Sequence, residues 1–530
     1  MHIKNILYYL FGLILLSGCT GSHIGGRTDW SDEYGTLTAG TPIQMQYGHD
    51  IDDDTPHNIA VLLPLSGDGA PVGRTIRTSI EMATLQNAPR GLNLSFYDTA
   101  QNLSETITNV LASNPEIIIG PVFSNDARTL RDAKSSEIPV LSFTSDATAI
   151  GDGVMTMALM PNNGIDTIVQ EMKSDNRQKF IVFAPNNNSG HLMAGAAIAA
   201  SEINNIELIG IFYYDEKNPD SIKSTAEIAS MNTARTVAHT RARQVLSDII
   251  TNERLTAIER SNLNTQLEKL SKTDALGRVP FDSVLFLGNG DDTKSLASYL
   301  RYYNVGANDA KFYGTPMWDG SDITSDFTMT GAKYASLPPI DSEFSTTYEK
   351  ISGGMANTLA AFGYDATKLA IGMIYSDKSN AAYLLDPSGY IGTNGIFRLN
   401  PNGDNERAMR IMELNGTGIA REVKPAPSDF LKPLYNINPH KISAADSMEL
   451  QTTGIDPDDF IKIPERFQSK YRSKTIGANT SVSTNVTQTA EPIEIISTEE
   501  NSETLTSSEY KPIKLESVRR SYIDEYEIEE

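Results

Sequence analysis

Small hydroxyl residues follow three short apolar runs in the first 150 residues of the chain. These residues are Ser66, Ser124, Thr144 and Ser145. In a parallel sheet, the carboxyl ends of the strands and the N-termini of the following helices meet at one edge, where free N–H groups attract anions. Hydroxyl groups at this edge can donate to a carboxylate or a peptide carbonyl, so the pattern predicts a binding site for such a group. Capping of helices and turns is the alternative role, because Ser and Thr are equally favoured there.

A second set of candidate residues lies further along the chain and suits a cationic group. Asn188 and Ser189 precede an expected helix and could close over a ligand, while Trp318 and Asp319 follow an expected strand that ends at Gly314. An aromatic ring beside a carboxylate attracts an ammonium group. Together with the hydroxyl residues, this set predicts a small zwitterion such as an amino acid as the ligand. Packing under a hinge between lobes is the alternative role of Trp318.

The sequence patterns of common enzymes and metal sites are missing. The chain contains no G-x-x-x-x-G-K-[ST], H-E-x-x-H or G-x-S-x-G pattern. Gly67, Gly69 and Gly73 do not match the G-x-G-x-x-G spacing of dinucleotide sites. Of the seven histidines, only His191 and His239 lie well inside the expected lobes, which is too few for a typical zinc site. We therefore expect no catalytic residue, no metal and no cofactor.

The single cysteine of the chain, Cys19, ends an N-terminal export signal. Lys4 supplies a positive charge, an apolar stretch ends at Leu16, and small residues precede the cysteine. The apolar stretch is shorter than the roughly 20 residues that span a membrane. Residues 16–19 resemble the bacterial lipoprotein box, in which the cysteine thiol is acylated, and Thr20 in place of aspartate implies the outer membrane, facing the periplasm. An ordinary signal peptide with an incidental cysteine is the alternative.

The composition is that of an acidic globular protein. The 530 residues are 39% hydrophobic and 21% charged, and the formal net charge is −23. This charge repels phosphate backbones and anionic lipid surfaces, which argues against nucleic-acid binding. Membrane attachment then depends on the acyl chains of Cys19, in which each buried CH₂ contributes about 0.8 kcal/mol. Because the only thiol is acylated, stability has to come from a hydrophobic core and not from disulfides.

Apolar runs and helical periodicities alternate along the chain and predict repeated strand–helix–strand units. The first series has expected strands at 58–64, 92–98, 117–120 and 139–143, and expected helices at 72–83, 103–112 and 126–136. The second series has expected strands at 179–184, 206–213, 283–288 and 311–314, and expected helices at 165–173, 192–204 and 294–303. We expect an α/β fold of two doubly wound parallel-sheet lobes, with a helical insertion in the second lobe.

The expected organisation has five parts. They are a signal peptide at 1–18, a tether at 19–56, a two-lobed domain at 57–425, a peripheral extension at 426–474 and a disordered acidic tail at 475–530. Within the domain, lobe 1 is expected at about 57–159 and 317–388, and lobe 2 at about 160–316 and 389–425 with the helical insertion at 220–275. A free tether of about 38 residues could extend to about 130 Å.

Five segments resemble the type I periplasmic-binding-protein fold, the two-lobed architecture of branched-chain amino acid receptors. They are 59–67 (IAVLLPLSG), 119–124 (IGPVFS), 138–144 (IPVLSFT), 183–190 (FAPNNNSG) and 363–366 (GYDA). Within that fold, the chain is most similar to the lipoproteins called penicillin-binding protein activators. They share the LLPLSG opening and a late strand like 395–399, which Asn400-Pro401-Asn402-Gly403 follows here. The best-known members carry a large helical-repeat domain before this fold, for which the short tether leaves no room.

The resemblance implies a non-catalytic outer-membrane lipoprotein that binds and regulates a peptidoglycan synthase, a penicillin-binding protein, in cell-wall biogenesis. The alternative is a substrate-binding lipoprotein of an ABC transporter for amino acids or related amides. An outer-membrane anchor favours the regulator, because it would separate a receptor from its inner-membrane permease. The array of Ser66, Ser124 and Thr144 favours the receptor. We expect the insertion at 220–275 to contact the synthase, because it is the one excursion from the regular winding.

Overall fold

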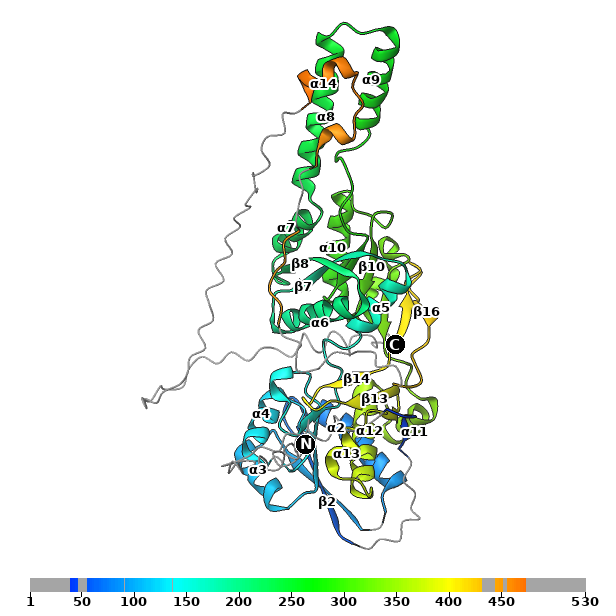
Figure 1. Ribbon diagram of the computed structural model, residues 1–530. Coiled ribbons are helices and arrows are strands. Elements are labelled where there is room, and N and C mark those ends of the chain that lie inside the picture. Colours follow the sequence, from blue (N-terminus) through cyan, green and yellow to red (C-terminus); the bar gives the residue numbers. More distant parts are fainter. Residues whose placement is uncertain are drawn as a thin grey trace, which may run out of the picture. The chain divides into compact units, whose positions relative to one another are not determined.

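The computed structural model describes residues 39–45, 55–89, 91–135, 137–430, 444–450 and 455–472. Two compact units divide these residues (Figure 1). The first unit consists of the described residues up to Met160, of Ile340–Glu406 and of Asp429 with Phe430, and the second consists of Pro161–Pro339, Arg407–Ser428 and the described residues after 443. The signal peptide, Cys19 and the acidic tail expected at 475–530 lie outside the described residues.

The first unit is built on a five-stranded parallel sheet with the strand order β3-β2-β4-β5-β6. Its strands are β2 (His57–Leu63), β3 (Leu92–Asp98), β4 (Ile117–Ile119), β5 (Val140–Ser142) and β6 (Val154–Thr156), and the helices between them are α2 (Ala70–Asn87), α3 (Leu103–Ala112) and α4 (Ser124–Ala133). The central strands are runs of buried aliphatic side chains, as in a parallel sheet that is covered on both faces. The predicted parallel winding is confirmed, and β6 is an additional strand.

Two glycines let the loops that follow β2 and β4 approach neighbouring backbone closely. A Cβ on Gly73, in α2, would lie 2.0 Å from the carbonyl oxygen of Pro64. Gly120 has a φ of +93°, and a Cβ there would lie 2.0 Å from the carbonyl oxygen of Leu62. Only glycine fits such positions, because any side chain would collide with the neighbouring carbonyl oxygen. The loops after β2 and β4 therefore pack directly on neighbouring backbone, and this packing positions the residues that follow the two strands.

A second, four-stranded sheet completes the first unit, with the order β1-β12-β13-β14. Its strands are β1 (Ile43–Gln44), β12 (Tyr390–Gly392), β13 (Gly395–Leu399) and β14 (Asn405–Arg407), and the accompanying helices are α11 (Ser342–Ser352), α12 (Thr358–Ile374) and α13 (Asn380–Leu384). α12 packs along α2 and so joins this part to the five-stranded sheet. β13 coincides with the strand that the sequence predicts at 395–399.

The prediction that residues 19–56 form a free tether is wrong for residues 39–45. β1 pairs in parallel with β12, and the N–H of Ile43 donates to the carbonyl oxygen of Gly389 at 2.8 Å. The side chain of Met45 is fully buried. A strand of two residues is too short to produce an apolar period, so the sequence pattern could not predict it. This pairing binds the segment to the first unit.

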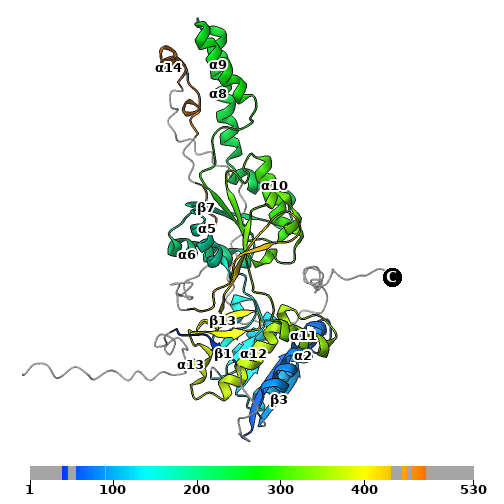
Figure 2. The same ribbon diagram turned by 90° about the vertical axis from the view of Figure 1, so that its right-hand side faces the viewer.

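The second unit is built on a seven-stranded sheet, which contains the strand labelled β7 in Figure 2. Its strand order is β16-β15-β11-β10-β9-β7-β8. Its strands are β7 (Lys179–Pro185), β8 (Glu207–Tyr214), β9 (Ser283–Phe286), β10 (Lys311–Gly314), β11 (Lys333–Ser336), β15 (Arg410–Glu413) and β16 (Arg421–Lys424). Its main helices are α5 (Ile165–Ser174), α6 (Asn188–Asn204), α7 (Pro219–Ala229) and α10 (Gly290–Tyr302), and 3₁₀ turns lie at Pro316–Trp318, Asp322–Ser325 and Phe327–Met329. β7 to β11 are parallel, whereas β15 and β16 are antiparallel additions.

Two of the three expected crossings between the lobes lie elsewhere in the chain. The first crossing follows Met160, close to its expected place. The second was expected at 317, but the chain up to Pro339 belongs to the second unit because β11 pairs in parallel with β10. The third was expected at 389, but the chain up to Glu406 belongs to the first unit because β12 pairs with β1 and β13. These strands are too short to carry a clear period of their own.

The helical insertion predicted at 220–275 contains helices with two different roles. α7 packs against β8 and α10 as a layer of the second unit. α8 (Asn232–Asn252) and α9 (Ala257–Leu270) form a hairpin that projects from this layer (Figure 1). The insertion therefore begins after α7 and not at residue 220. The extension predicted at 426–474 supplies the 3₁₀ turn η6 (Pro457–Asp459) and the helix α14 (Glu465–Tyr471).

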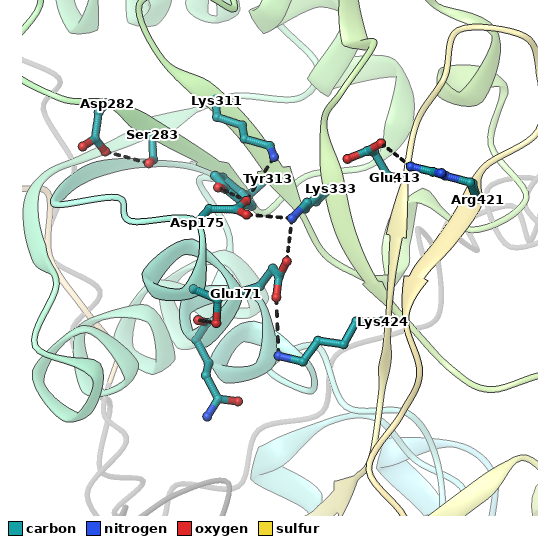
Figure 3. Close-up of polar contacts among 12 residues, drawn as sticks. Glu171, Asp175, Asp282, Ser283, Lys311, Tyr313, Lys333, Glu413, Arg421 and Lys424 are labelled. Atoms are coloured by element: carbon teal, nitrogen blue, oxygen red, sulfur yellow. Dashed lines mark hydrogen bonds and ion pairs between the residues drawn. The ribbon is translucent and has the colours of Figure 1, made fainter.

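A cluster of paired charges ties α5 to the sheet of the second unit (Figure 3). Lys333 is buried on β11, and its Nζ lies 2.6 Å from Oε1 of Glu171 and 2.8 Å from Oδ1 of Asp175. The Asp175 carboxylate also accepts from Nζ of Lys311 at 3.0 Å and from the Tyr313 hydroxyl at 2.7 Å. Burial raises the pKa of Asp175, but the hydrogen bonds from these three partners outweigh burial and lower the pKa to about 2.

We expect the second unit to lose stability as the pH falls from about 3.8, the ordinary pKa of aspartate, to about 2. Because the pKa of Asp175 is lowered in the folded state, its contribution is complete above the unfolded pKa and disappears as the pH passes the folded pKa. The contribution is on the order of 1 kcal/mol after screening by solvent. Urea unfolding should show this loss in the Asp215→Asn control, an exposed aspartate of the same unit. Asp175→Asn should abolish it, and an unchanged pH profile in that variant would contradict the expectation.

Candidate functional site

The carboxyl edge of the first unit's parallel sheet brings the predicted hydroxyl residues together. β2, β4 and β5 are neighbours in this sheet. The residues that follow these strands therefore lie at one edge, as the sequence predicts, and they are Ser66, Ser124, Thr144 and Ser145. Their hydroxyl groups differ in what they contact, and this decides which of them can meet a ligand.

Ser66 is held in place by Asp98, the last residue of β3. The Asp98 carboxylate accepts from the backbone N–H groups of Leu65 (2.8 Å), Ser66 (3.3 Å) and Ala100 (3.0 Å). Burial raises the pKa of Asp98, but hydrogen bonds from the Ser66 side chain, from the N–H groups of Ala100 and Leu65 and from the Gln101 side chain outweigh burial and lower the pKa. The Ser66 hydroxyl also accepts from Nε2 of Gln101 at 3.1 Å. Asp98 was not among the predicted site residues, although its place at the end of a strand beside β2 is a signal that could have identified it.

Ser124 and Ser145 keep their hydroxyl groups available, whereas Thr144 does not. Ser124 begins α4 and Ser145 is exposed, and neither hydroxyl forms a hydrogen bond within the part of the chain that the structure describes. Thr144 is 3% exposed, and its hydroxyl accepts from the N–H of Asp146 at 3.2 Å. Its carbonyl oxygen accepts from the Thr156 hydroxyl at 2.6 Å. Thr144 therefore forms part of a turn, and ligand binding remains a prediction for the other three residues.

One ion pair and one partly buried carboxyl group lie at this edge. Nη1 of Arg128, on α4, lies 2.8 Å from Oδ2 of Asp146, which also caps the 3₁₀ turn Ala147–Ala149. Burial raises the pKa of Asp126 in the first turn of α4. This arrangement offers N–H and hydroxyl donors at the edge, so it suits a carbonyl or a single carboxylate.

Asn188 and Ser189 lie in the first turn of α6, in the second unit. Asn188 is exposed and Ser189 is half-buried. The helix is capped by Asn187, whose Oδ1 accepts from the N–H of Gly190 at 2.8 Å. Asn188 and Ser189 are therefore not needed as caps, and they remain predicted ligand contacts.

A segment that was expected to be peripheral, residues 444–450, packs beside this helix terminus. The imidazole of His191 stacks on the ring of Tyr213, with centroids 4.0 Å apart. The carbonyl oxygen of Ala445 accepts from the Tyr213 hydroxyl at 2.7 Å and lies 2.8 Å from Nδ1 of His191. Burial and a neighbouring aspartate raise the pKa of Tyr213 to about 12, so its hydroxyl stays protonated as the donor. Met448 adds an isolated bridge to β8.

The predicted role of Trp318 in binding a cation is wrong. Its side chain is fully buried in the core of the second unit, with ring centroids 6.4 Å from Phe286 and 5.7 Å from Tyr334. A Cβ on Gly314 would lie 2.2 Å from the indole, so the ring packs directly on the strand end. The alternative of a packed tryptophan is the correct one. Asp319 is exposed, and its carboxylate interacts with the hydroxyl groups of Ser336 and Tyr334, so the buried Trp318 ring does not form a cation site with it.

The base of the α8–α9 hairpin is fixed by the buried residue Arg235. Its guanidinium donates at 3.0 to 3.4 Å to the backbone oxygens of Ser230, Gly277, Tyr303 and Asn304. Ser230 and Tyr303 are the C-caps of α7 and α10, where the helix dipole favours a cation. Arg235 was not among the predicted residues, because its carbonyl partners come from three separate parts of the chain and leave no local pattern.

The hairpin has a small hydrophobic core of its own, to which the C-terminal segment contributes. The buried members of this core are Ala238, Ala242, Leu246, Ile249, Leu263, Leu276, Ile461 and Phe467. The last two come from residues 455–472, which contain η6 and α14. The surface that the sequence predicts for a partner therefore includes a segment that the sequence places outside the insertion.

Among the described residues, no helix has the length and apolar character that crossing a membrane requires. Within the same residues, no group of three or more His, Cys, Asp or Glu side chains is arranged to hold a metal ion.

The chain is similar to a lipoprotein family and to named relatives. Residues 28–415 match the model of the family described as "LppC putative lipoprotein". The penicillin-binding protein activator LpoA of Photobacterium profundum is 20% identical over 325 residues, which cover 59% of this chain and 49% of that protein. The activator LpoA of Vibrio vulnificus is 21% identical over 349 residues, which cover 62% of this chain and 53% of that protein. The chain thus spans about half the length of these relatives.

A similarity to a solved structure concerns the fold alone. A structure described as "a putative branched-chain amino acid ABC transporter" from Rhodospirillum rubrum matches with a TM-score of 0.51 and 15% identity. The match covers 69% of this chain and 100% of that chain. It confirms the predicted architecture of the type I periplasmic-binding-protein fold and, at this identity, carries no conclusion about ligands.

We expect Arg235→Ala to loosen the hairpin without unfolding the rest of the second unit. The change removes the charged donor from four backbone oxygens, so the free energy of local opening of α8 should fall by about 2–4 kcal/mol. Hydrogen exchange followed by mass spectrometry measures this loss. Arg243→Ala, at an exposed position of the same helix, is the control and should leave protection unchanged. Equal protection of α8 in Arg235→Ala and in the wild type would refute the role of Arg235.

Proposed function

This chain belongs to the LppC lipoprotein family, and we propose that it binds a penicillin-binding protein and regulates peptidoglycan synthesis. The similarity to proteins named penicillin-binding protein activators, over 59% and 62% of the chain, is the observation that carries this proposal. The match to a type I periplasmic-binding-protein architecture is compatible with it but does not select it, because a fold alone does not fix a function.

In this proposal the chain acts as a partner and not as a catalyst. Asp98, at the carboxyl edge of the first sheet, has a lowered pKa and accepts three backbone N–H groups. A general base works best with a pKa near the operating pH, so Asp98 is better suited to ordering the loop of Ser66. In the second unit, Lys333 is committed to Glu171 and Asp175, which likewise supports a structural role.

We place the attachment at Cys19, with acyl chains in the outer membrane and the folded units in the periplasm. Gly40 is the first residue with a described contact, and its N–H donates to the Ser388 hydroxyl at 2.7 Å. About 20 residues therefore separate the acylated cysteine from the fold, and they span at most about 70 Å. This is roughly half the reach of a tether that is free up to residue 56. The partner has to come correspondingly closer to the outer membrane.

The outer surface of the α8–α9 hairpin is the proposed contact with the partner. Residues 232–272 carry seven basic and four acidic side chains, a net charge of +3, whereas the whole chain carries −23. Arg243 and Arg254 are exposed, and neither side chain has an ion pair within the described part of the chain. Val237 is 62% and Ile258 74% exposed. Exposed apolar side chains beside available arginines are typical of protein interfaces.

Cys19→Ser should release the protein into the soluble periplasmic fraction. The thiol is the acceptor of the acyl chains, and without them no apolar anchor of this kind remains. Fractionation of outer membranes with an antibody to the folded units measures the change. Ser22→Ala, three positions further on, is the control and should stay in the membrane fraction. Sedimentation of the serine variant with outer membranes would refute the anchor.

Removal of the hairpin should abolish co-purification with a penicillin-binding protein. The variant replaces residues 232–275 with a short Gly-Ser linker and also lacks residues 455–530, because α14 would lose its groove. Circular dichroism and melting should show that the rest of the second unit persists. The matched control lacks only residues 455–530 and should still co-purify.

Two results would change the assignment. A folded deletion variant that still binds the synthase would place the interface outside the hairpin. An intact protein that co-purifies with no penicillin-binding protein, but shows heat with an amino acid in calorimetry, would favour the transport receptor.

A further inference from the structure

The groove between α8 and α9 is filled by a segment from a distant part of the chain. Residues 455–472 pack along the hairpin as η6 and α14 (Figure 1). Arg466 and Glu259, which form an ion pair across this contact, are 207 positions apart. The segment is joined to the chain on both sides by residues outside the described ranges.

The segment is held in the groove by a few apolar anchors. Ile461 and Phe467 are buried among side chains of α8 and α9, and Tyr471 packs beside them. The amide of Gln266, on α9, pairs with the backbone of Lys462, accepting from its N–H at 2.7 Å and donating to its oxygen at 2.9 Å. Both hydrogen bonds go to the backbone of Lys462 and not to its side chain. The backbone of another peptide can therefore form the same two hydrogen bonds with Gln266.

The two cations of α14 meet two carboxylates at the end of the hairpin. Arg466 forms two contacts with the Glu259 carboxylate, one of them 2.7 Å long from Nη2 to Oε2. Lys470 pairs with Glu253, whose Oε1 also accepts from the Tyr471 hydroxyl at 2.8 Å. The groove is therefore acidic where the outer surface of the hairpin is basic.

The docked helix is suited to exchange. α14 has seven residues, fewer than the roughly 12 that an isolated helix needs in water, so its helical form depends on the groove. The Arg466 and Lys470 side chains are 51% and 62% exposed, and ion pairs this exposed contribute little to stability. A helix with the same charges and more apolar contact can therefore take the place of α14.

We propose that the groove between α8 and α9 is an exchangeable binding site for a cationic amphipathic helix, with α14 as its resting occupant. α14 defines the chemistry of the partner helix: a cation directly before an aromatic residue, repeated four positions later, as in Arg466-Phe467 and Lys470-Tyr471. Residues four apart share one face of a helix, so both rings face the groove and both cations reach its carboxylates. This site is defined by the hairpin itself and does not depend on which protein the outer surface binds.

A labelled peptide tests the exchange in the full-length protein. The double variant Phe467→Ala/Tyr471→Ala removes both ring contacts of α14 and so vacates the groove without changing its charges, and the probe is a fluorescein-labelled synthetic peptide of residues 455–472. Fluorescence anisotropy should show binding to this variant at least tenfold tighter than to the wild type. The difference arises because the tethered α14 competes at an effective concentration of about a millimolar in the wild type.

A charge exchange tests the specificity of the groove. Adding Glu253→Lys to the vacated variant should weaken binding of the peptide about tenfold. A peptide that carries Lys470→Glu should recover this affinity, since it restores opposite charges. Glu268→Lys is the control, because Glu268 is exposed and pairs with Lys272, which follows the C-terminus of α9, and not with the docked segment. It should leave the affinity unchanged.

Hydrogen exchange separates an exchangeable occupant from a fixed one. In the wild type, the amides of α14 should exchange at least a hundredfold faster than those on the buried face of α8, and α8 and α9 should stay protected in the vacated variant. Equal exchange of α14 and α8 would overturn the proposal, as would loss of protection throughout the hairpin when α14 is released. Peptide binding that is equal in the wild type and the vacated variant, or absent from both, would also overturn it.

Discussion

The charge of Arg235 cannot be removed by deprotonation, and it is buried where the hairpin leaves the second unit. Its donors meet backbone oxygens at the C-termini of α7 and α10 and on the chain that returns from α9. A buried guanidinium without such partners would be very costly, so α8 has to leave the layer in a direction that keeps these contacts. The direction of the hairpin, its groove and its exposed surface all follow from this requirement.

The hairpin then separates opposite charges between two surfaces. Glu253 and Glu259 face α14, which neutralises them with Lys470 and Arg466. The arginines on the outer surface are left without described ion pairs, in a chain whose net charge is −23. A locally basic surface on an acidic protein steers acidic partners toward one place. The proposed occupancy of the groove and the proposed binding at the outer surface thus concern different faces of the same two helices.

The serine and threonine residues at the carboxyl edge of the first sheet differ in whether their hydroxyl groups form hydrogen bonds within the protein. Thr144 is part of a turn, and Ser66 is part of the loop that Asp98 holds in place. The hydroxyl groups of Ser124 and Ser145 form no hydrogen bond with any described residue. A receptor fold therefore persists here with only part of the predicted donor set available. The α8–α9 hairpin of the second unit is where this chain departs from regular winding.

The sequence by itself determined the α/β class, the order of most strands and helices, and the common edge of the hydroxyl residues, because buried runs and helical periods are local patterns. It determined neither the crossings at Pro339 and Glu406 nor the strand at Ile43. Strands of two to four residues are too short to show a periodicity, and they are defined only by the strands with which they pair. Burial of Trp318, the carbonyl partners of Arg235 and the docking of α14 were decided by tertiary structure alone. Each depends on contacts between residues far apart in the chain, and such contacts produce no periodic pattern in the sequence.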